Sequence, residues 1–225
     1  PVAEILAHAD ALAPVMDRLI AYPPRAMFGL EDTLTAQLER LRALGVDKLL
    51  APGIGAAELG ARLGMHLFGG FSLNLTNSLA LDEAQRAGLC DTELSIELDL
   101  VRAKALSGTL ARGIIAYGRL PLMLVRCCPL KHTTTCAACA QRGGYMSDRL
   151  NNRFWVACEG AGSEVFNCHT LYLADRLPEL REFDFITLLF TDETARTAQS
   201  VIRAYQMGGT PPKEFTRGLY YRGIL

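Results

Sequence analysis

Short apolar runs alternate with helical stretches along most of the chain, at intervals of roughly twenty residues. Strands that alternate with helices are typical of a parallel β-sheet whose strands are joined by crossover helices. The alternation therefore predicts an α/β fold, either an open doubly wound sheet or a (β/α) barrel. The predicted strands are 25–30, 48–52, 66–74, 93–98, 113–118, 122–126 and 183–190, and the predicted helices are 31–44, 56–64, 78–88, 99–106 and 193–206, after one or two helices within 2–21.

The residues at helix faces and helix ends support several of these assignments. Four leucines from Leu34 to Leu44 recur at the spacing of one helix face, and Gly45 follows at a position that suits the end of a helix. Asn77 or Ser78 is placed to cap the helix that follows. These signals predict helices with defined ends rather than a loosely helical region.

The length of the chain favours an incomplete barrel. A complete eight-stranded barrel takes about 250 residues, whereas this chain has 225. We therefore expect a partial TIM-type (β/α) barrel, as in one part of a longer protein, with a cysteine-rich metal-binding insertion near its C-terminal part. No GxGxxG or Walker-type loop follows the first predicted strand, so a nucleotide site is not supported. The expected parts are a barrel portion (1–126), a cluster-binding segment (127–182), and a final strand, helix and tail packing on the barrel (183–225).

Six of the seven cysteines fall between residues 127 and 168, and this clustering points to a metal. A CxxC motif, Cys136 with Cys139, lets two thiolates turn toward one ion. Cys128 lies eight positions before the motif and Cys158 lies nineteen after it. Four sulfurs so spaced suit a tetrahedral zinc site or an iron–sulfur cluster. The spacing leaves the metal open, and it leaves open which four of the six are ligands, since Cys127 and Cys168 are also present.

Two other interpretations of these cysteines remain. Free cysteines often pack as small buried hydrophobes. A CxxC can also be a redox pair of the thioredoxin kind, which normally lies at the start of a helix that follows a strand. Here three threonines, 133–135, precede the motif and a glycine pair, 143–144, follows it, so we expect a loop instead.

Basic side chains are concentrated around the cysteines. Residues 101–153 contain nine Lys or Arg and one acid, Asp148, in a chain whose net charge is −1. Such a region suggests an anionic partner, either RNA or a carboxylated small molecule, although a basic face that pairs with acidic neighbours is the alternative. Arg119 and Arg126 flank the strand that leads into Cys128 and are candidates for anion binding. Asn74 is a candidate to face a ligand at the barrel mouth.

The cysteine content also indicates in which cellular compartment the protein is expected. Clustered cysteines, odd in number, suit a metal site in the cytoplasm better than a disulfide framework. No run of about eighteen apolar residues is present, so no membrane span is expected. If a preceding part of a barrel is missing, we expect the chain to associate with that part or to form a homo-oligomer.

A series of short motifs in the C-terminal half resembles the U-32 peptidase family, the collagenase-like proteins. The motifs are a YGRLPLM strand (117–123), a Cys-Pro pair, the CxxC, a DR…F-x-V stretch (148–156), a further cysteine, and a TRG sequence near the end (216–218). The resemblance extends over roughly residues 25–225. Asn151 or Asn152 stands where the family usually has a glycine.

The resemblance implies a divided set of functions. The family name implies proteolysis, whereas better-studied relatives resemble oxygen-independent hydroxylases that hold a four-iron (4Fe-4S) cluster on four cysteines. Some of these hydroxylate an RNA base, with prephenate as the expected oxygen donor, and others act on a ubiquinone precursor. This chain looks most like the ribosomal-RNA cytidine hydroxylase branch. By position, the resemblance implies that the cluster ligands are Cys128, Cys136, Cys139 and Cys158.

Two alternative functions are retained. A peptidase would fit the family name, but HExxH and GxSxG are absent, and adjacent residues such as Cys168 and His169 generally point their side chains apart. A structural zinc module with no catalytic role would use the same four cysteines. Trp155 either packs beneath the metal loop or stacks on a base.

Overall fold

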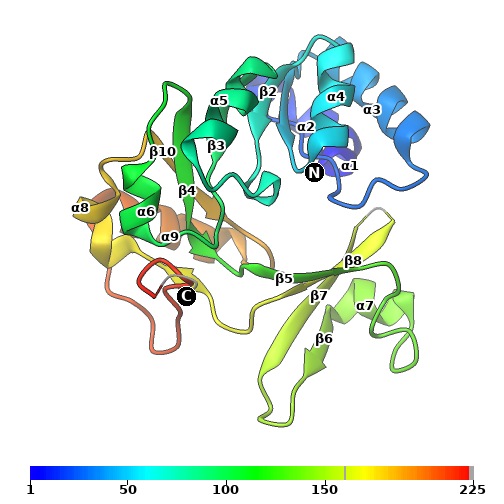
Figure 1. The fold of residues 1–225 in the computed structure, drawn as a ribbon. Coiled ribbons are helices and arrows are strands. Elements are labelled where there is room, and N and C mark those ends of the chain that lie inside the picture. The colour runs from blue at the N-terminus through cyan, green and yellow to red at the C-terminus, as the bar shows by residue number, and fades with distance from the viewer. Residues whose placement is uncertain (160, 223–225) are drawn as a thin grey trace.

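A parallel sheet curls into a half-barrel in the computed structural model, which describes residues 1–159 and 161–222 (Figure 1). The α/β class is confirmed, and the sheet does not close into a complete barrel. A short strand β9 (Leu171–Tyr172) pairs antiparallel with β4. The parallel strands lie in the order β1 (Lys48–Ala51), β2 (His66–Gly69), β3 (Leu89–Glu93), β4 (Ala111–Gly118) and β10 (Phe185–Leu189).

Helices cover the convex side of this sheet, and their ends follow the residues that the sequence marks. Gly45, with φ of +95°, ends α3, and Asn77 caps α5 by accepting a hydrogen bond from the Ala80 N–H at 2.9 Å. The covering helices are α3 (Glu31–Ala43), α4 (Ile54–Arg62), α5 (Ser78–Arg86), α6 (Leu100–Ala105) and α9 (Ala195–Met207). The chain begins with α1 (Val2–Ala7), α2 (Ala9–Leu12) and the 3₁₀ helix η1 (Ala13–Arg18), and shorter turns are η2 (Phe71–Leu73), η3 (Ala174–Arg176) and α8 (Leu177–Leu180).

The main hydrophobic core lies between the sheet and its covering helices. Leu38 and Leu41 of α3, Leu49 of β1, Leu81 of α5 and Ile114 of β4 are completely buried. Burying one such side chain contributes about 2 kcal/mol. The covering helices do not lie on the opposite, concave side of the sheet (Figure 1).

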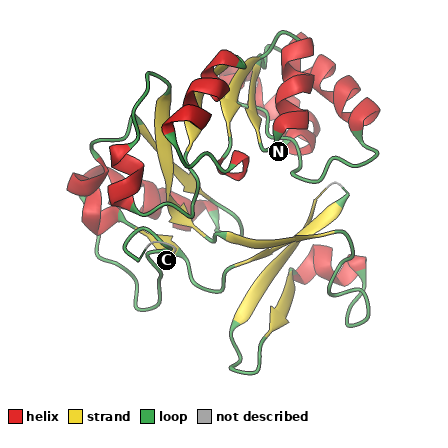
Figure 2. Cartoon of the chain, in the orientation of Figure 1, coloured by secondary structure: helices red, strands yellow, loops and turns green. Residues whose placement is uncertain are grey.

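A second, antiparallel sheet projects from the half-barrel and carries the cysteine-rich segment (Figures 1 and 2). Its strand order is β5-β8-β7-β6, and helix α7 (Cys136–Arg142) lies against it. Leu130, Val156 and Val165 form its small core. We call the segment 121–166 the cysteine module. Its strands are β5 (Pro121–Val125), β6 (Gly144–Ser147), β7 (Arg153–Glu159) and β8 (Gly162–Phe166).

Several strand predictions are wrong. Residues 25–30 form a loop with a turn at Gly29 (φ +71°), and the segment that pairs with β1 is instead at Ala21, which bridges Leu49. The predicted strand 93–98 begins where β3 ends, and only 66–69 of the predicted strand 66–74 is extended. The strand predicted at 122–126 exists, but it belongs to the cysteine module.

None of the helices within the described ranges has the length and apolar character needed to cross a bilayer.

Candidate functional site

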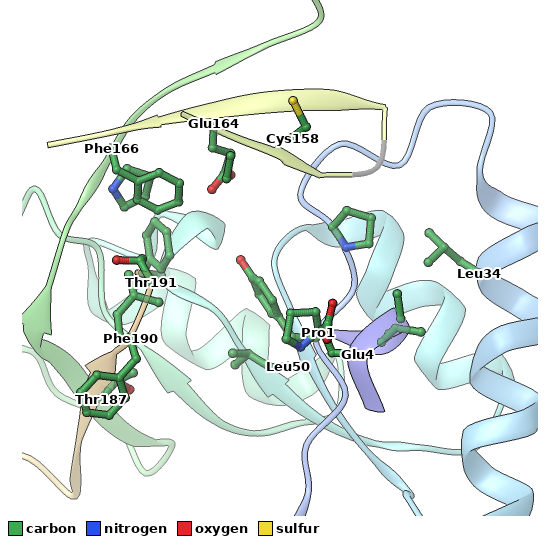
Figure 3. Close-up of a pocket in the computed structure, with 18 of the residues that line it drawn as sticks. Pro1, Glu4, Leu34, Leu50, Cys158, Glu164, Phe166, Thr187, Phe190 and Thr191 are labelled. Carbon is green, nitrogen blue, oxygen red and sulfur yellow. The ribbon is translucent and has the colours of Figure 1, made fainter. Parts of the chain in front are cut away.

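A cavity of about 770 Å³ lies between the concave side of the half-barrel and the cysteine module (Figure 3). In parallel α/β sheets, ligands bind at the carboxyl ends of the strands. Glu93 is the last residue of β3, and Thr187 and Leu189 come from the second half of β10. The cavity therefore occupies the position at which this fold class places its sites. The cysteine module contributes Trp155, Ala157, Cys158, Glu164 and Phe166 to the wall.

Glu93 is a buried carboxylate held by donors from two distant parts of the chain. It is 5% exposed, and it accepts hydrogen bonds from the Phe71 backbone N–H at 3.0 Å and from the Thr187 hydroxyl at 2.6 Å. Burial raises the pKa of Glu93, and the two hydrogen bonds oppose that rise. Asp91 lies two residues earlier on β3, and burial, Glu93 and Asp184 raise its pKa to about 6.

A second buried carboxylate, Glu164, comes from the cysteine module. Its Oε1 lies 3.0 Å from Arg25 Nη1, and the Glu164 side chain is 7% exposed. Burial raises the pKa of Glu164, and the Arg25 guanidinium opposes this. Arg25 also lies over the ring of Phe71, 5.3 Å from its centroid. This ion pair ties the loop before α3 to strand β8.

Aromatic rings form part of the cavity wall. Trp155 and Phe166 lie with their ring centroids 4.9 Å apart. Figure 3 shows the Phe166 ring and the Glu164 carboxylate on the cavity side of the module. Trp155 thus lies at the cavity, on the face of β7 opposite to Val156, because alternate residues of a strand point to opposite faces.

The predicted ligand cysteines belong to the opposite face of the same sheet. Cys128 and Cys139 pack against the small core of Leu130, Val156 and Val165. Cys158 lies on β7 two positions after Val156, and its Sγ is 3.4 Å from Ser163 Oγ. In Figure 3 the Cys158 sulfur points away from the cavity. The sheet of the cysteine module therefore separates the cavity from the face of these thiols.

The CxxC motif lies at the start of a helix, so the prediction of a loop is wrong. Cys136 is the first residue of α7, and Thr135 caps this helix by accepting a hydrogen bond from the Ala138 N–H at 3.2 Å. Cys136 and Cys139 are three residues apart and therefore lie on one side of the helix. Cys136 is exposed, whereas Cys139 is partly buried.

The fit of a metal to these thiols is incomplete. Four thiols in one module have the donor chemistry of zinc or iron–sulfur sites. Among residues 1–159 and 161–222, however, no three or more Cys, His, Asp or Glu side chains converge closely enough to hold a metal ion. The assignment of Cys128, Cys136, Cys139 and Cys158 as ligands therefore stays a prediction. The remaining thiols are Cys90, Cys127 and Cys168.

The three predicted binding residues have other contacts. Arg119 Nη1 donates to the backbone carbonyls of Asn167 and Cys168, at 3.2 and 2.6 Å, and its Nε lies 3.4 Å from Asp192 Oδ1. Arg119 thus links the residues that follow β8 to Asp192, which follows β10.

Arg126 is exposed beside Phe28, with its guanidinium 5.9 Å from the ring centroid. Asn74 adopts a left-handed conformation, with φ of +55°, and accepts a hydrogen bond from the Ser95 hydroxyl. Among the described residues, the wall of the cavity includes neither these two residues nor Arg119.

Sequence reasoning missed Glu93, Glu164 and Arg25. The predicted strand 93–98 has Glu93 at its start, whereas the structure has it at the end of β3. The sequence before Glu93 has no continuous apolar run that would mark a buried strand, because Asp91 and Thr92 directly precede it. The position of Arg25 depends on a partner 139 residues away, for which local sequence has no signal.

No protein-family model matches this chain, and neither the curated proteins nor the solved structures include a significant match to it.

Proposed function

We propose that this protein is an iron–sulfur-dependent, oxygen-independent hydroxylase of the U-32 type that modifies RNA, with its substrate group bound in the cavity. One observation carries the proposal. The module that carries the four cysteines also closes the cavity at the carboxyl edge of the half-barrel, and its strand β7 presents Trp155 to the cavity on one face and the Cys158 thiol on the other (Figure 3). A redox group on Cys128, Cys136, Cys139 and Cys158 would thus lie across a single sheet from a substrate site.

The cavity residues supply binding and exclusion of water in this proposal. Trp155 and Phe166 offer flat apolar surface for a ring, and aromatic side chains stack on bases irrespective of sequence. Glu93 and Glu164 offer carboxylate oxygens that fix donor groups or hold a proton. When bound, an iron–sulfur cluster supplies one-electron transfer, with hydrogen bonds to its sulfurs setting its potential.

Exposed basic side chains of the cysteine module supply the contact with RNA. Arg126, Lys131 and Arg149 are exposed, and they lie on the loops around β5, α7 and β7. Positive side chains of this kind neutralise phosphates and release counterions, which makes binding depend on salt. A carboxylated co-substrate such as prephenate, as the oxygen donor, is the second anion that this module would attract.

The test is a metal assay on protein purified without oxygen. We expect iron and acid-labile sulfide in equal amounts, with a visible absorption band. Both are lost in Cys128→Ala, Cys136→Ala, Cys139→Ala and Cys158→Ala and kept in the matched control Cys90→Ala. Incubation of the loaded protein with ribosomal RNA and prephenate should then add one oxygen atom to a base, as detected by mass spectrometry of the nucleosides.

Other outcomes would contradict the proposal and select an alternative. Zinc without sulfide indicates a structural zinc module. A Cys136–Cys139 disulfide that forms reversibly without metal indicates a dithiol redox protein, a candidate favoured by the position of Cys136 at the first residue of α7. Cleavage of a peptide substrate by metal-free protein indicates the peptidase.

A further inference from the structure

The charged side chains that line the cavity all carry the same sign. They are the carboxylates of Glu4, Glu93 and Glu164, and the described lining residues include no Lys, Arg or His. Glu4 lies at the exposed rim, where it is 3.6 Å from His8. The interior charges are therefore those of Glu93 and Glu164.

The two interior carboxylates differ in their partners. Glu164 has a cationic partner, because Arg25 lies 3.0 Å from it. Glu93 is held by a backbone N–H and a hydroxyl, both neutral donors, and within the described ranges no Lys, Arg or His side chain forms an ion pair with it. Buried charges in proteins are usually paired. Among the described residues, the Glu93 carboxylate thus has hydrogen-bond donors but no cationic partner.

Aromatic rings surround the same space. Trp155 and Phe166 lie on the module side, and Phe71 and Phe190 on the half-barrel side. A ring face attracts a cation, and this chain already uses that interaction where Arg25 lies 5.3 Å from the Phe71 centroid. Rings together with a carboxylate favour a ligand that has both a cationic end and an apolar body.

We propose that the cavity binds a small organic cation, with its ammonium end at Glu93 and its apolar body against Trp155 and Phe166. A carboxylated ligand is disfavoured there, because it would bring a second negative charge beside that of Glu93, which has no cationic partner, into a largely apolar space. The anions expected for this protein would then bind at the exposed basic side chains of the module. Cation binding itself does not need a cluster, so it is tested separately from the proposed function.

The experiment uses the metal-free protein and three probes of similar size and different charge: phenethylammonium, 2-phenylethanol and phenylacetate. Trp155 is the only tryptophan in the chain, so its fluorescence reports occupation of the cavity directly. We expect phenethylammonium to bind about tenfold more tightly than the alcohol, and phenylacetate more weakly than the alcohol. Equal binding of the cation and the alcohol, or tighter binding of phenylacetate, would overturn the proposal.

Variants locate the charge that selects the cation. Glu93→Gln keeps the shape of the side chain and should reduce the preference for phenethylammonium over the alcohol by about tenfold. Glu39→Gln, on the exposed face of α3, is the matched control and should leave the preference unchanged. An unchanged preference in a folded Glu93→Gln protein contradicts the proposal, and if that variant fails to fold, the three-probe series on the parent protein still decides. Metal analysis of the parent tests the cluster separately.

Discussion

Arg25 Nη1 lies 3.0 Å from Glu164 Oε1, and this ion pair joins a loop of the half-barrel to the central strand pair of the cysteine module. The two residues are 139 positions apart in the chain. Their side chains are 21% and 7% exposed, so the pair is largely removed from water. The Arg25–Glu164 contact therefore helps fix the module that closes the cavity.

Removing one partner of this pair should destabilise the protein. Arg25→Ala leaves Glu164 buried without its cation, and we expect a loss of about 2 kcal/mol in the free energy of unfolding at neutral pH. Urea titration followed by circular dichroism measures this, and the double variant with Glu164→Gln should recover part of the loss. Arg86→Ala removes an exposed pair with Glu83 and should change stability by less than about 0.5 kcal/mol. Equal losses in the two single variants would contradict the role given to Arg25.

The stability of the protein should fall as the pH rises through the acidic range. The pKa of Asp91 is about 6 in the folded protein, against an ordinary value of 3.8. The native state then holds a proton that the unfolded chain releases, so the free energy of unfolding decreases between about pH 4 and pH 6. The pKa values of Glu93 and Glu164 are also raised, and these residues contribute in the same direction.

Asp91→Asn isolates the contribution of one residue. It removes the ionisation, so we expect a shallower fall in stability with pH and a more stable protein at neutral pH. Denaturation midpoints at a series of pH values measure both effects. Asp10→Asn, at an exposed position of α2, is the control and should preserve the slope of the parent protein. If Asp91→Asn does not change the dependence of stability on pH, that dependence comes from other titratable groups.

The helices were predictable because their signals are local. The cap at Asn77 and the end of α3 at Gly45 each depend on residues within a few positions. The end of β3 was not predictable, because the carboxylate of Glu93 is held by Phe71 and Thr187, which lie 22 and 94 residues away. An alternating pattern therefore placed the strand after Glu93 instead of before it.

The cysteine module was predicted by composition and missed in form. The clustered cysteines identify the segment. They do not predict its small antiparallel sheet, because its short strands resemble a loop in the sequence. Asn151 or Asn152 stands where the resembled family usually has a glycine. Asn151 adopts φ of +64° in the turn between β6 and β7, a left-handed conformation that glycine and asparagine both tolerate. Convergence of the thiols depends on bound metal as well as on the fold, so neither spacing nor this structure determines the ligands.

Gly118 should not tolerate alanine. Its φ is +126°, and an added Cβ would contact the carbonyl oxygen of Leu189 on the neighbouring strand β10. We expect Gly118→Ala to cost at least about 2 kcal/mol, because it combines backbone strain with a backbone clash. Gly55→Ala is the matched control, since its Cβ meets open space within α4, and it should be neutral or stabilising by about 0.5 kcal/mol. Thermal unfolding compares the two, and equal melting temperatures would contradict the prediction.

The two arginines predicted to bind anions should behave differently toward RNA. Arg126 is exposed, whereas Arg119 is engaged by Asp192 and two backbone carbonyls. If the module binds RNA as proposed, Arg126→Ala should weaken binding and lower the salt-dependence slope of log K by about 0.7, the contribution of one phosphate contact on a single strand. Arg119→Ala should lower the melting temperature and, at a temperature where the variant is folded, leave that slope unchanged. Fluorescence anisotropy at several salt concentrations measures the slopes, and a slope reduced by Arg119→Ala but not by Arg126→Ala would reverse the roles assigned to these two side chains.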